Sequence, residues 1–369
     1  MSSRNTIRNW IIVSLTTIAS VLLTEVVSSS LLGNQVFSFA SESFENEISD
    51  FYIRIARKAR RNKKTSDLVR IVYIDQAQSR KEIASVIEKV ASCNPRVIGL
   101  DIRFDQTGLK GDEELIRVLK DNQKKLVLSV TGSGTFNYNE CTFESIKSSF
   151  FMDSLDTTNV GFDNLITEKG ISVIRELLLS TVYNGTELNS FAYSIFNMCH
   201  GDSIRVERTH RLYYYPTYFY PVTDTCELLD KTNILADKMV LIGAKDDIDD
   251  LHVTPIGTLP GVDIHAQVLQ GLIENRTITY IPKWVVWLIS IIVALLFSCF
   301  LLSSKLHLSN YDNLLVRLTQ LVSLVLLLAL GAVLFVYFDV FLNFAPLFGV
   351  LVFGAFAFDV IFGLSSFVK

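Results

Sequence analysis

The stretch Met239–Ile273, MVLIGAKDDIDDLHVTPIGTLPGVDIHAQVLQGLI, decides how the rest of the chain is organised. Its first six residues, MVLIGA, form an apolar run of the length expected for a buried strand. The acidic residues that follow predict an irregular loop. Pro260-Gly261 then opens a helix, because apolar residues recur at helical spacing at positions 262, 264, 268, 269, 272 and 273. About ten residues later a long apolar run begins, so this strand–loop–helix unit connects a folded domain to a membrane.

The charged residues are segregated along the chain. Hydrophobic residues make up 49% of the sequence and charged residues 20%. Residues 33–282 hold 28 of the 34 Lys and Arg residues and 34 of the 38 Asp and Glu residues. This pattern predicts one water-exposed domain between membrane spans. The net charge of −4 argues against a nucleic-acid partner and leaves the lipid bilayer as the partner that the hydropathy requires.

Four apolar runs predict four transmembrane helices, one N-terminal and three C-terminal. We expect a cytoplasmic N-terminus at 1–9, spans at 10–32, 284–302, 319–338 and 340–362, and a cytoplasmic loop at 303–318. The basic residues that would then share one side are Arg4, Arg8, Lys305, Arg317 and Lys369, and the positive-inside rule makes that side cytoplasmic. The domain at 33–282 is therefore expected on the extracytoplasmic side. A cleaved signal peptide is the alternative for the first run, which is longer than an ordinary signal sequence.

Two acidic residues lie within the expected spans. Glu25 and Asp359 are candidate functional residues, because ionisable groups are costly in a bilayer. For Glu25, the alternative is a position near the outer interface.

Strand and helix patterns alternate after the first span. We expect a helix at 43–64 with Phe44, Ile48, Phe51 and Ile55 along one face and a basic opposite face. Strands are expected at 68–75, 96–104, 125–130 and 159–163, and a strand-like run at 211–222. Helices are expected at Asp112–Lys120 and Ser190–Cys199, and another is expected to carry an apolar stripe of Ile83, Val86, Ile87 and Val90. Residues 131–160 are polar and predict a loop. The alternation indicates an α/β domain with a mainly parallel sheet flanked by helices.

The best candidate binding site follows the carboxyl ends of the strands, where ligands bind in open α/β sheets. The candidate ligand-binding residues are Asp75, Asp101, Asp105, Asp246, Asp247, Asp249, Asp250, His252, Asp263 and His265. Calcium is one possible ligand, although the spacing fits no standard loop, and the metal is left undetermined. The structural alternative gives Asp250, Asp263 and His265 the roles of a cap, a turn clamp and a buried imidazole.

No pattern of catalytic residues is found. The sequence lacks G-x-S-x-G, a Walker loop and H-E-x-x-H, so we expect no enzyme activity and no cofactor. Four of the five cysteines fall in the polar block, without zinc spacing, and are either paired or buried free thiols.

The opening stretch resembles the closing signature of the second-type CHASE domain family. The resemblance lies in Val240–Ala244 (VLIGA), Asp250–Pro255 (DLHVTP) and Pro260–Ala266 (PGVDIHA). RVIGLDIRF, DLVRIVYID and NVGFD resemble further strands of the family, whereas the helix start Ser190-Phe191-Ala192 departs from it by lacking a proline. The resemblance implies an extracytoplasmic sensor domain of bacterial transmembrane receptors, in the inner membrane.

We therefore expect a membrane-anchored sensor or interaction protein with an unknown extracytoplasmic ligand. Such receptors usually continue into a cytoplasmic enzyme, whereas this sequence ends at Lys369, a few residues after the last span. The signal would then pass through the spans to a separate effector protein, with a homo-oligomer possible. The alternatives are an assembly component of a membrane complex and, less favoured by the apolar spans, a transporter or membrane enzyme.

Overall fold

The computed structural model describes residues 3–29, 36–59, 64–75, 78–137, 140–156, 159–166, 173–201, 209–212, 214, 218–219, 234–245, 247–307 and 313–367. The chain forms two compact units. The helical unit comprises Met1–Ala56 and Ile278–Lys369, and the sheet unit comprises Arg57–Thr277.

Six described strands form the main sheet of the sheet unit, in the order β2-β12-β3-β4-β5 with β6 also paired to β4. Five of them run parallel: β2 (Val69–Ile74), β12 (Met239–Ala244), β3 (Val97–Asp101), β4 (Leu126–Ser133) and β6 (Asn159–Phe162). Strand β5 (Ser145–Lys147) runs antiparallel to β4. The run MVLIGA is thus β12, and it lies between β2 and β3. The expected α/β unit with a mainly parallel sheet is confirmed.

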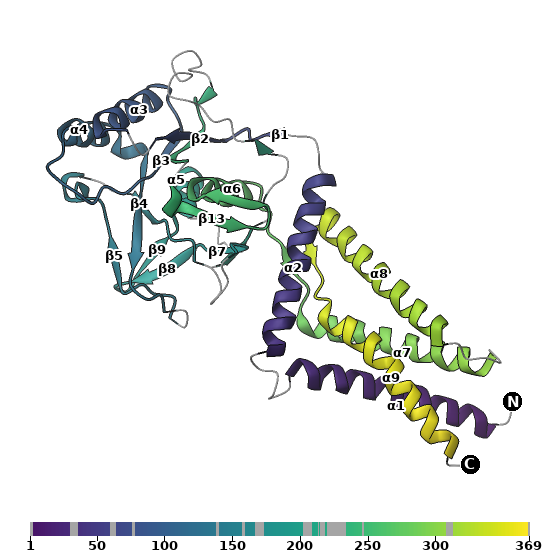
Figure 1. Ribbon diagram of the computed structural model, residues 1–369. Coiled ribbons are helices and arrows are strands. Elements are labelled where there is room, and N and C mark those ends of the chain that lie inside the picture. The colour runs from purple at the N-terminus through teal and green to yellow at the C-terminus, as the bar shows by residue number, and fades with distance from the viewer. Residues whose placement is uncertain are drawn as a thin grey trace. The chain divides into compact units, whose positions relative to one another are not determined.

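Helices cover both faces of this sheet (Figure 1). On one face lie α3 (Arg80–Ser92) and α4 (Asp112–Asn122), and on the other lie α5 (Phe191–His200) and α6 (Gly261–Ile273). The apolar stripe expected on α3 is buried. Helix α3 begins with a capping box, in which the Ser79 hydroxyl accepts from the Glu82 backbone N–H and the Glu82 carboxylate accepts from Ser79.

Glycines in the strands let α5 and α6 pack closely on the sheet. A Cβ at Gly161 of β6 would lie 2.6 Å from the Phe191 Cα, and a Cβ at Gly243 of β12 would lie 2.8 Å from the Val262 Cβ. These separations are too short for carbon atoms in contact. The glycines of the VLIGA and NVGF segments are therefore required by helix–sheet packing.

The variant Gly161→Ala is expected to lower the stability of the sheet unit by about 1–3 kcal/mol or more, because overpacking forces a backbone shift. The added carbon meets main-chain atoms of α5, which cannot rotate away. Urea unfolding of the full-length protein, followed by circular dichroism, measures the loss. Gly363→Ala is the control, since its added Cβ meets nothing within 4 Å. Equal stability of the two variants would contradict the packing argument.

Short elements complete the sheet unit. They are β1 (Lys64–Thr65), η1 (Gln123–Lys125), η2 (Met152–Ser154), β7 (Glu176–Leu178), β8 (Ser180–Tyr183), β9 (Thr186–Asn189), β10 (Thr209–Arg211), β11 (Tyr218–Phe219), η5 (Ile248–Asp250), β13 (Leu251–Thr254) and β14 (Gly257–Pro260). Strand pairs are β1–β11, β7–β10, β8–β9 and β13–β14.

Several expected boundaries in the sheet unit require correction. Residues 131–160 are not simply a loop, because β4 continues to Ser133, β5 follows, and the aromatic residues Phe143 and Phe151 are buried. The segment after β12 is not irregular, because η5 and the β13–β14 hairpin occupy it. Strand β3 ends at Asp101, short of the expected 104. Most of the strand-like run 211–222 lies outside the described residues.

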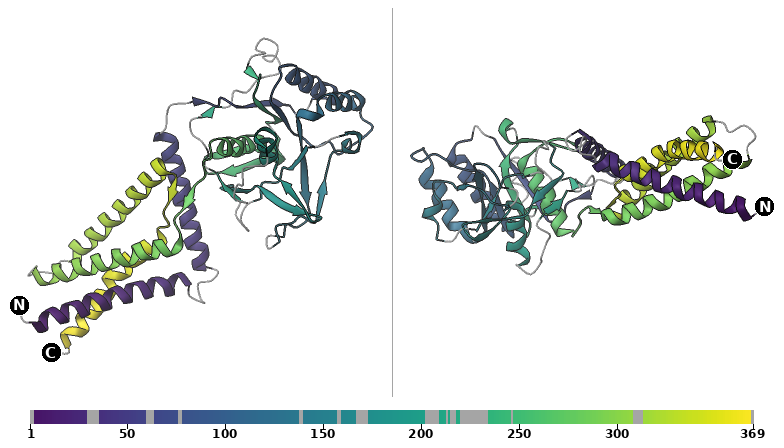
Figure 2. Two further views of the ribbon diagram at one scale, coloured as in Figure 1. Left: turned by 180° about the vertical axis from the view of Figure 1, so that it is seen from behind. Right: turned by 90° about the horizontal axis from the view of Figure 1, so that it is seen from below.

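Among the described residues of the helical unit, four helices are long and apolar enough to cross a membrane. They lie within α1 (Ser3–Ser29), α7 (Lys283–His307), α8 (Asn313–Phe338) and α9 (Ala345–Phe367). The candidate spans are Thr6–Val27, Lys283–Leu306, Val316–Phe338 and Ala345–Ser365. Helices α1, α7 and α9 lie side by side (Figure 2). The Thr17 hydroxyl donates to the Ser298 hydroxyl at 3.3 Å, and the Gln320 Nε2 donates to the Leu351 carbonyl at 2.8 Å. Such polar contacts between helices are typical of membrane packing.

Two helix expectations in this unit were wrong in detail. Helix α2 spans Val36–Ala59, and its buried side includes Ile48, Tyr52, Ile53 and Ala56, whereas Phe51 is 54% exposed. The last span begins at Ala345, because Val340–Phe341 form β16, which pairs with β15 (Thr279–Tyr280). The Asn343 side chain then caps α9 by accepting from the Ala345 N–H at 2.9 Å.

Candidate functional site

The five parallel strands end at one edge of the sheet, where acidic residues gather. Asp101 is the last residue of β3 and Asp163 directly follows β6, whereas Asp75 directly follows β2, two strands away from β3. The carboxyl edge of an open parallel sheet is the usual place for a ligand. The segment after β12 contributes Asp250 and His252 to this cluster. Their charges lie close enough to Asp101 to shift its pKa.

Asp250 holds the first turn of α6. Its Oδ2 accepts from the Gly261 N–H at 3.1 Å, and its Oδ1 lies 3.2 Å from the His252 Nε2. Pro260 at the N-cap makes no side-chain cap, so the carboxylate of Asp250, at the end of η5, takes this role. A Cβ at Gly261 would lie 2.4 Å from the Asp250 Oδ1, which explains why the helix starts with glycine.

The environment of Asp101 favours its neutral form. Burial and, second, the negative charge of Asp250 raise the pKa of Asp101 to about 8, against the opposing effect of His252. A neutral carboxyl group can donate a hydrogen bond, whereas the carboxylate only accepts. Near neutral pH this side chain therefore carries a proton for most of the time.

Asp163 and His265 complete the cluster. Burial raises the pKa of Asp163 to about 6, while the hydrogen bond from the Thr131 hydroxyl at 2.7 Å acts in the opposite direction. His265, in the first turn of α6, is buried and packs edge-on against Phe191 with ring centroids 5.2 Å apart. Burial lowers its pKa, although Asp163 and Asp250 oppose the change. The imidazole is thus neutral at pH 7.

A buried hydroxyl lies beside this cluster. Leu100 pairs with Leu128, so Asp101 and Ser129 follow side by side on the neighbouring strands. Ser129 is 1% exposed, and its Oγ has no hydrogen-bond partner among the described residues. An unpaired buried polar group costs about 1–3 kcal/mol, so it needs a partner that this arrangement does not provide.

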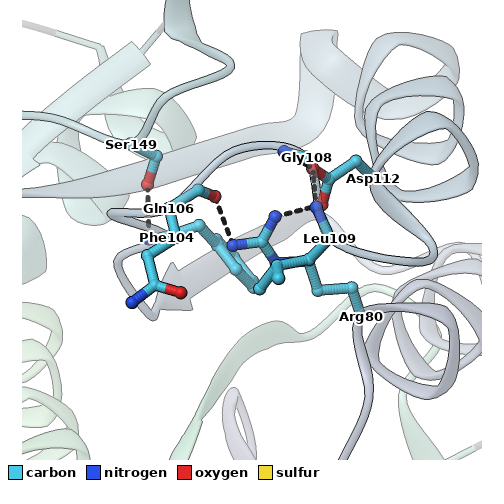
Figure 3. A network of polar contacts seen from close by, with 7 residues as sticks. All are labelled: Arg80, Phe104, Gln106, Gly108, Leu109, Asp112 and Ser149. Atoms are coloured by element: carbon cyan, nitrogen blue, oxygen red, sulfur yellow. Dashed lines mark hydrogen bonds and ion pairs between the residues drawn. The ribbon is translucent and has the colours of Figure 1, made fainter.

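A buried ion pair fixes the segment that leaves β3 after Asp101 (Figure 3). The Arg80 guanidinium pairs with the Asp112 carboxylate and donates to the Gln106 carbonyl; the two charged side chains are only 10% and 12% exposed. Asp112 also accepts from the Gly108 and Leu109 N–H groups, at 2.9 and 3.0 Å. The Arg80 Cζ lies 4.8 Å from the centroid of the Phe150 ring. This network anchors residues 104–112 and with them the position of Asp101.

The structure separates the other predicted residues from this cluster. Asp263 accepts from the Tyr73 hydroxyl at 2.8 and 2.9 Å, and burial raises its pKa. Asp105 is exposed and paired with Arg103. Asp247 caps η5 by accepting from the N–H of the exposed Asp249, and Asp75 is exposed at the end of β2. Asp246 lies outside the described residues.

No group of three or more His, Cys, Asp or Glu side chains in the described part of the chain is arranged to hold a metal ion. The calcium hypothesis thus gains no support. Cys93, Cys141, Cys199 and Cys299 form no disulfide among the described residues, and Cys226 lies outside them. Glu25 and Asp359 both have exposed side chains, on α1 and α9. Ligand binding at the predicted residues stays a prediction.

Sequence reasoning missed Asp163. It directly follows the segment NVGF, which was expected to be a strand, and the rule that selected Asp75 and Asp101 applies to it as well. Thr131 was missed because the strand was expected to end at Val130, whereas β4 continues to Ser133.

Taken together, the fold is that of an α/β domain that has apolar helices before and after it along the chain, with a cluster of acidic and histidine residues at the carboxyl edge of its sheet. The family model described as CHASE2 domain matches residues 20–302, and the chain belongs to this family. Comparison with curated proteins found no match. Comparison with solved structures found none either.

Proposed function

We propose that this chain is an extracytoplasmic sensor of a bacterial inner membrane. The observation that carries the proposal is the CHASE2 match, which covers the whole sheet unit together with parts of the apolar helices. In this arrangement the sheet unit is outside the cell, the four apolar helices cross the bilayer, and the carboxyl edge of the sheet receives the stimulus. The protein has no catalytic role.

The chain connections give a route for a conformational signal. Helix α6 is followed by residues 274–282, which include β15, and then by α7. Within the helical unit, β15 pairs with β16 between α8 and α9, and the Ile281 N–H donates to the Phe341 carbonyl at 3.1 Å. A shift of α6 would therefore act directly on the connection to α7.

The second connection is α2, which precedes the sheet unit. Inside the helical unit its Tyr52 is fully buried, and the hydroxyl donates to the Leu328 carbonyl of α8 at 2.9 Å. The Tyr52 ring packs against Phe335, Phe341 and Phe344 with centroids 5.8–6.3 Å apart. We propose that α2 and α7 together transmit the state of the sheet unit to an effector protein, and that a homo-oligomer is the functional form.

Labelling of single cysteines tests the proposed side of the membrane. On a cysteine-free background, Ile248→Cys, whose native side chain is 83% exposed in the sheet unit, is expected to react with a membrane-impermeant maleimide in intact spheroplasts. Leu306→Cys, at the other end of α7 from the sheet-unit connection, is expected to react only after the membrane is permeabilised. The reverse pattern would place the sheet unit in the cytoplasm and exclude an extracytoplasmic sensor.

An assembly role is the second candidate, favoured by one surface feature. Ile248, Leu251 and Val253 of η5 and β13 are 83%, 41% and 49% exposed. Neighbouring exposed apolar side chains of this kind often mark a protein contact. Co-purification with one fixed partner, without any change on stimulation, would favour this role over sensing.

A further inference from the structure

The cluster at the carboxyl edge lies at the start of α6. Asp250 binds the Gly261 N–H, and His265 occupies the first turn. His265 also makes a hydrogen bond to the backbone of Asp163, so both of these contacts tie the helix start to the edge of the sheet. Eleven of the thirteen α6 residues are buried. The helix can therefore move in only two ways: its first turn is released from these contacts, or the whole helix shifts as a rigid unit.

Among the residues that the structure describes, few positive charges balance the acidic groups here. The titratable and charged groups that act on one another are Asp101 of β3, Asp163 after β6, Asp250 and His252 of the η5–β13 segment, His265 of α6, and Arg103 after β3. Arg103 is already paired with Asp105 at 2.5 Å. Three carboxyl groups therefore share a site in which full ionisation places like charges next to one another.

We propose that this cluster is a proton-controlled clamp on the first turn of α6, closed when Asp101 is protonated and loosened when Asp101 ionises beside Asp250. A proton can lower the negative charge of the cluster without a cavity or a metal site. The unpaired Ser129 hydroxyl next to Asp101 is a ready partner for the neutral carboxyl group. The clamp deepens the proposed function and rests on it: the stimulus is the proton concentration on the side of the membrane that holds the sheet unit.

The pKa values define the working range of the clamp. Asp101 has a pKa of about 8 and Asp163 of about 6, both raised first by burial, so the cluster loses protons between about pH 6 and 8. When the clamp opens, Asp101 regains its ordinary value of 3.8. The equilibrium constant for opening then rises by up to about tenfold for each pH unit until about pH 8, because the open form binds the proton more weakly than the closed form.

Hydrogen–deuterium exchange of the full-length protein in lipid nanodiscs tests the clamp. After correction for the intrinsic pH dependence of exchange, the amides of α6 are expected to exchange at least tenfold faster at pH 8.5 than at pH 6.0. In Asp101→Asn they are expected to stay slow at both pH values. Asp121→Asn is the matched control, because Asp121 is exposed on α4, on the other face of the sheet from α6, and pairs with Arg117 outside the cluster; it should behave as wild type.

The result that overturns the proposal is wild-type exchange in α6 that does not change with pH, or a change that Asp101→Asn retains. Size-exclusion chromatography establishes whether each variant is folded. If a variant is not folded, the comparison of wild-type exchange at pH 6.0 and pH 8.5 decides the test. The outcome is independent of the cysteine labelling described above: a pH-dependent clamp with the sheet unit in the cytoplasm would refute the sensor orientation and leave the clamp intact.

Discussion

Replacing Arg80 by alanine is expected to lower the free energy of unfolding of the sheet unit by about 3–5 kcal/mol, the usual cost of breaking a buried ion pair on one side. The change leaves the Asp112 carboxylate, 12% exposed, without its counter-charge. It also frees the Gln106 carbonyl and removes the guanidinium from the faces of Phe104 and Phe150. Residues 104–112 would lose their anchor, and the position of Asp101 at the end of β3 would loosen with them.

The buried thiol of Cys93 provides the measurement. It is 6% exposed at the end of α3, so its reaction with a maleimide in urea reports unfolding of this part of the sheet unit. The other four cysteines would be replaced by alanine in the full-length protein. Arg117→Ala is the control, because Arg117 on α4 makes exposed pairs with Glu88 and Asp121 that contribute about 0–1 kcal/mol. A similar urea midpoint for both arginine variants would show that the Arg80 pair has no special role.

Much of the fold could be predicted because its elements carry strong local patterns. Strands β2, β3, β4 and β12 are short apolar runs, and α3 shows its stripe at Ile83, Val86, Ile87 and Val90. The order of the strands could not be read locally, since β12 enters between β2 and β3 from about 140 residues further along the chain. The face of α2 was misjudged because several apolar stripes are compatible with its sequence, and only packing selects the one containing Tyr52.

The candidate site was predictable to the extent that it follows the edge of a parallel sheet. That rule selected Asp101, and the signature segment supplied Asp250, His252 and His265. The sequence could not separate these residues from Asp105, Asp247 and Asp249, which lie close to Asp101 or Asp250 in the sequence but make contacts with other groups. The role of Arg80 was also hidden, because its partner Asp112 is 32 residues away and a single arginine at a helix start has no distinctive pattern.

Stability that falls as the pH rises is the second large effect, and Asp101 is its main source. The folded protein binds a proton at Asp101 with a pKa of about 8, whereas the ordinary value is 3.8. The contribution of Asp101 is therefore fully present below about pH 4 and is lost as the pH rises to about 8, since in that range only the folded state holds the proton. Each pH unit between the two pKa values corresponds to about 1.4 kcal/mol, so the total loss is several kcal/mol.

Asp101→Asn should remove most of this slope, because an amide resembles the protonated carboxyl group and does not ionise. We expect the variant to be more stable than wild type at pH 8 by several kcal/mol and similar to it near pH 4, measured by urea unfolding with circular dichroism at a series of pH values. Asp121→Asn should keep the wild-type slope and lose at most about 1 kcal/mol, because its exposed pair with Arg117 contributes little. A wild-type protein that is as stable at pH 8 as at pH 5 would mean that Asp101 is ionised in the fold, and that the cluster is balanced by a positive charge that the described side chains around it do not supply.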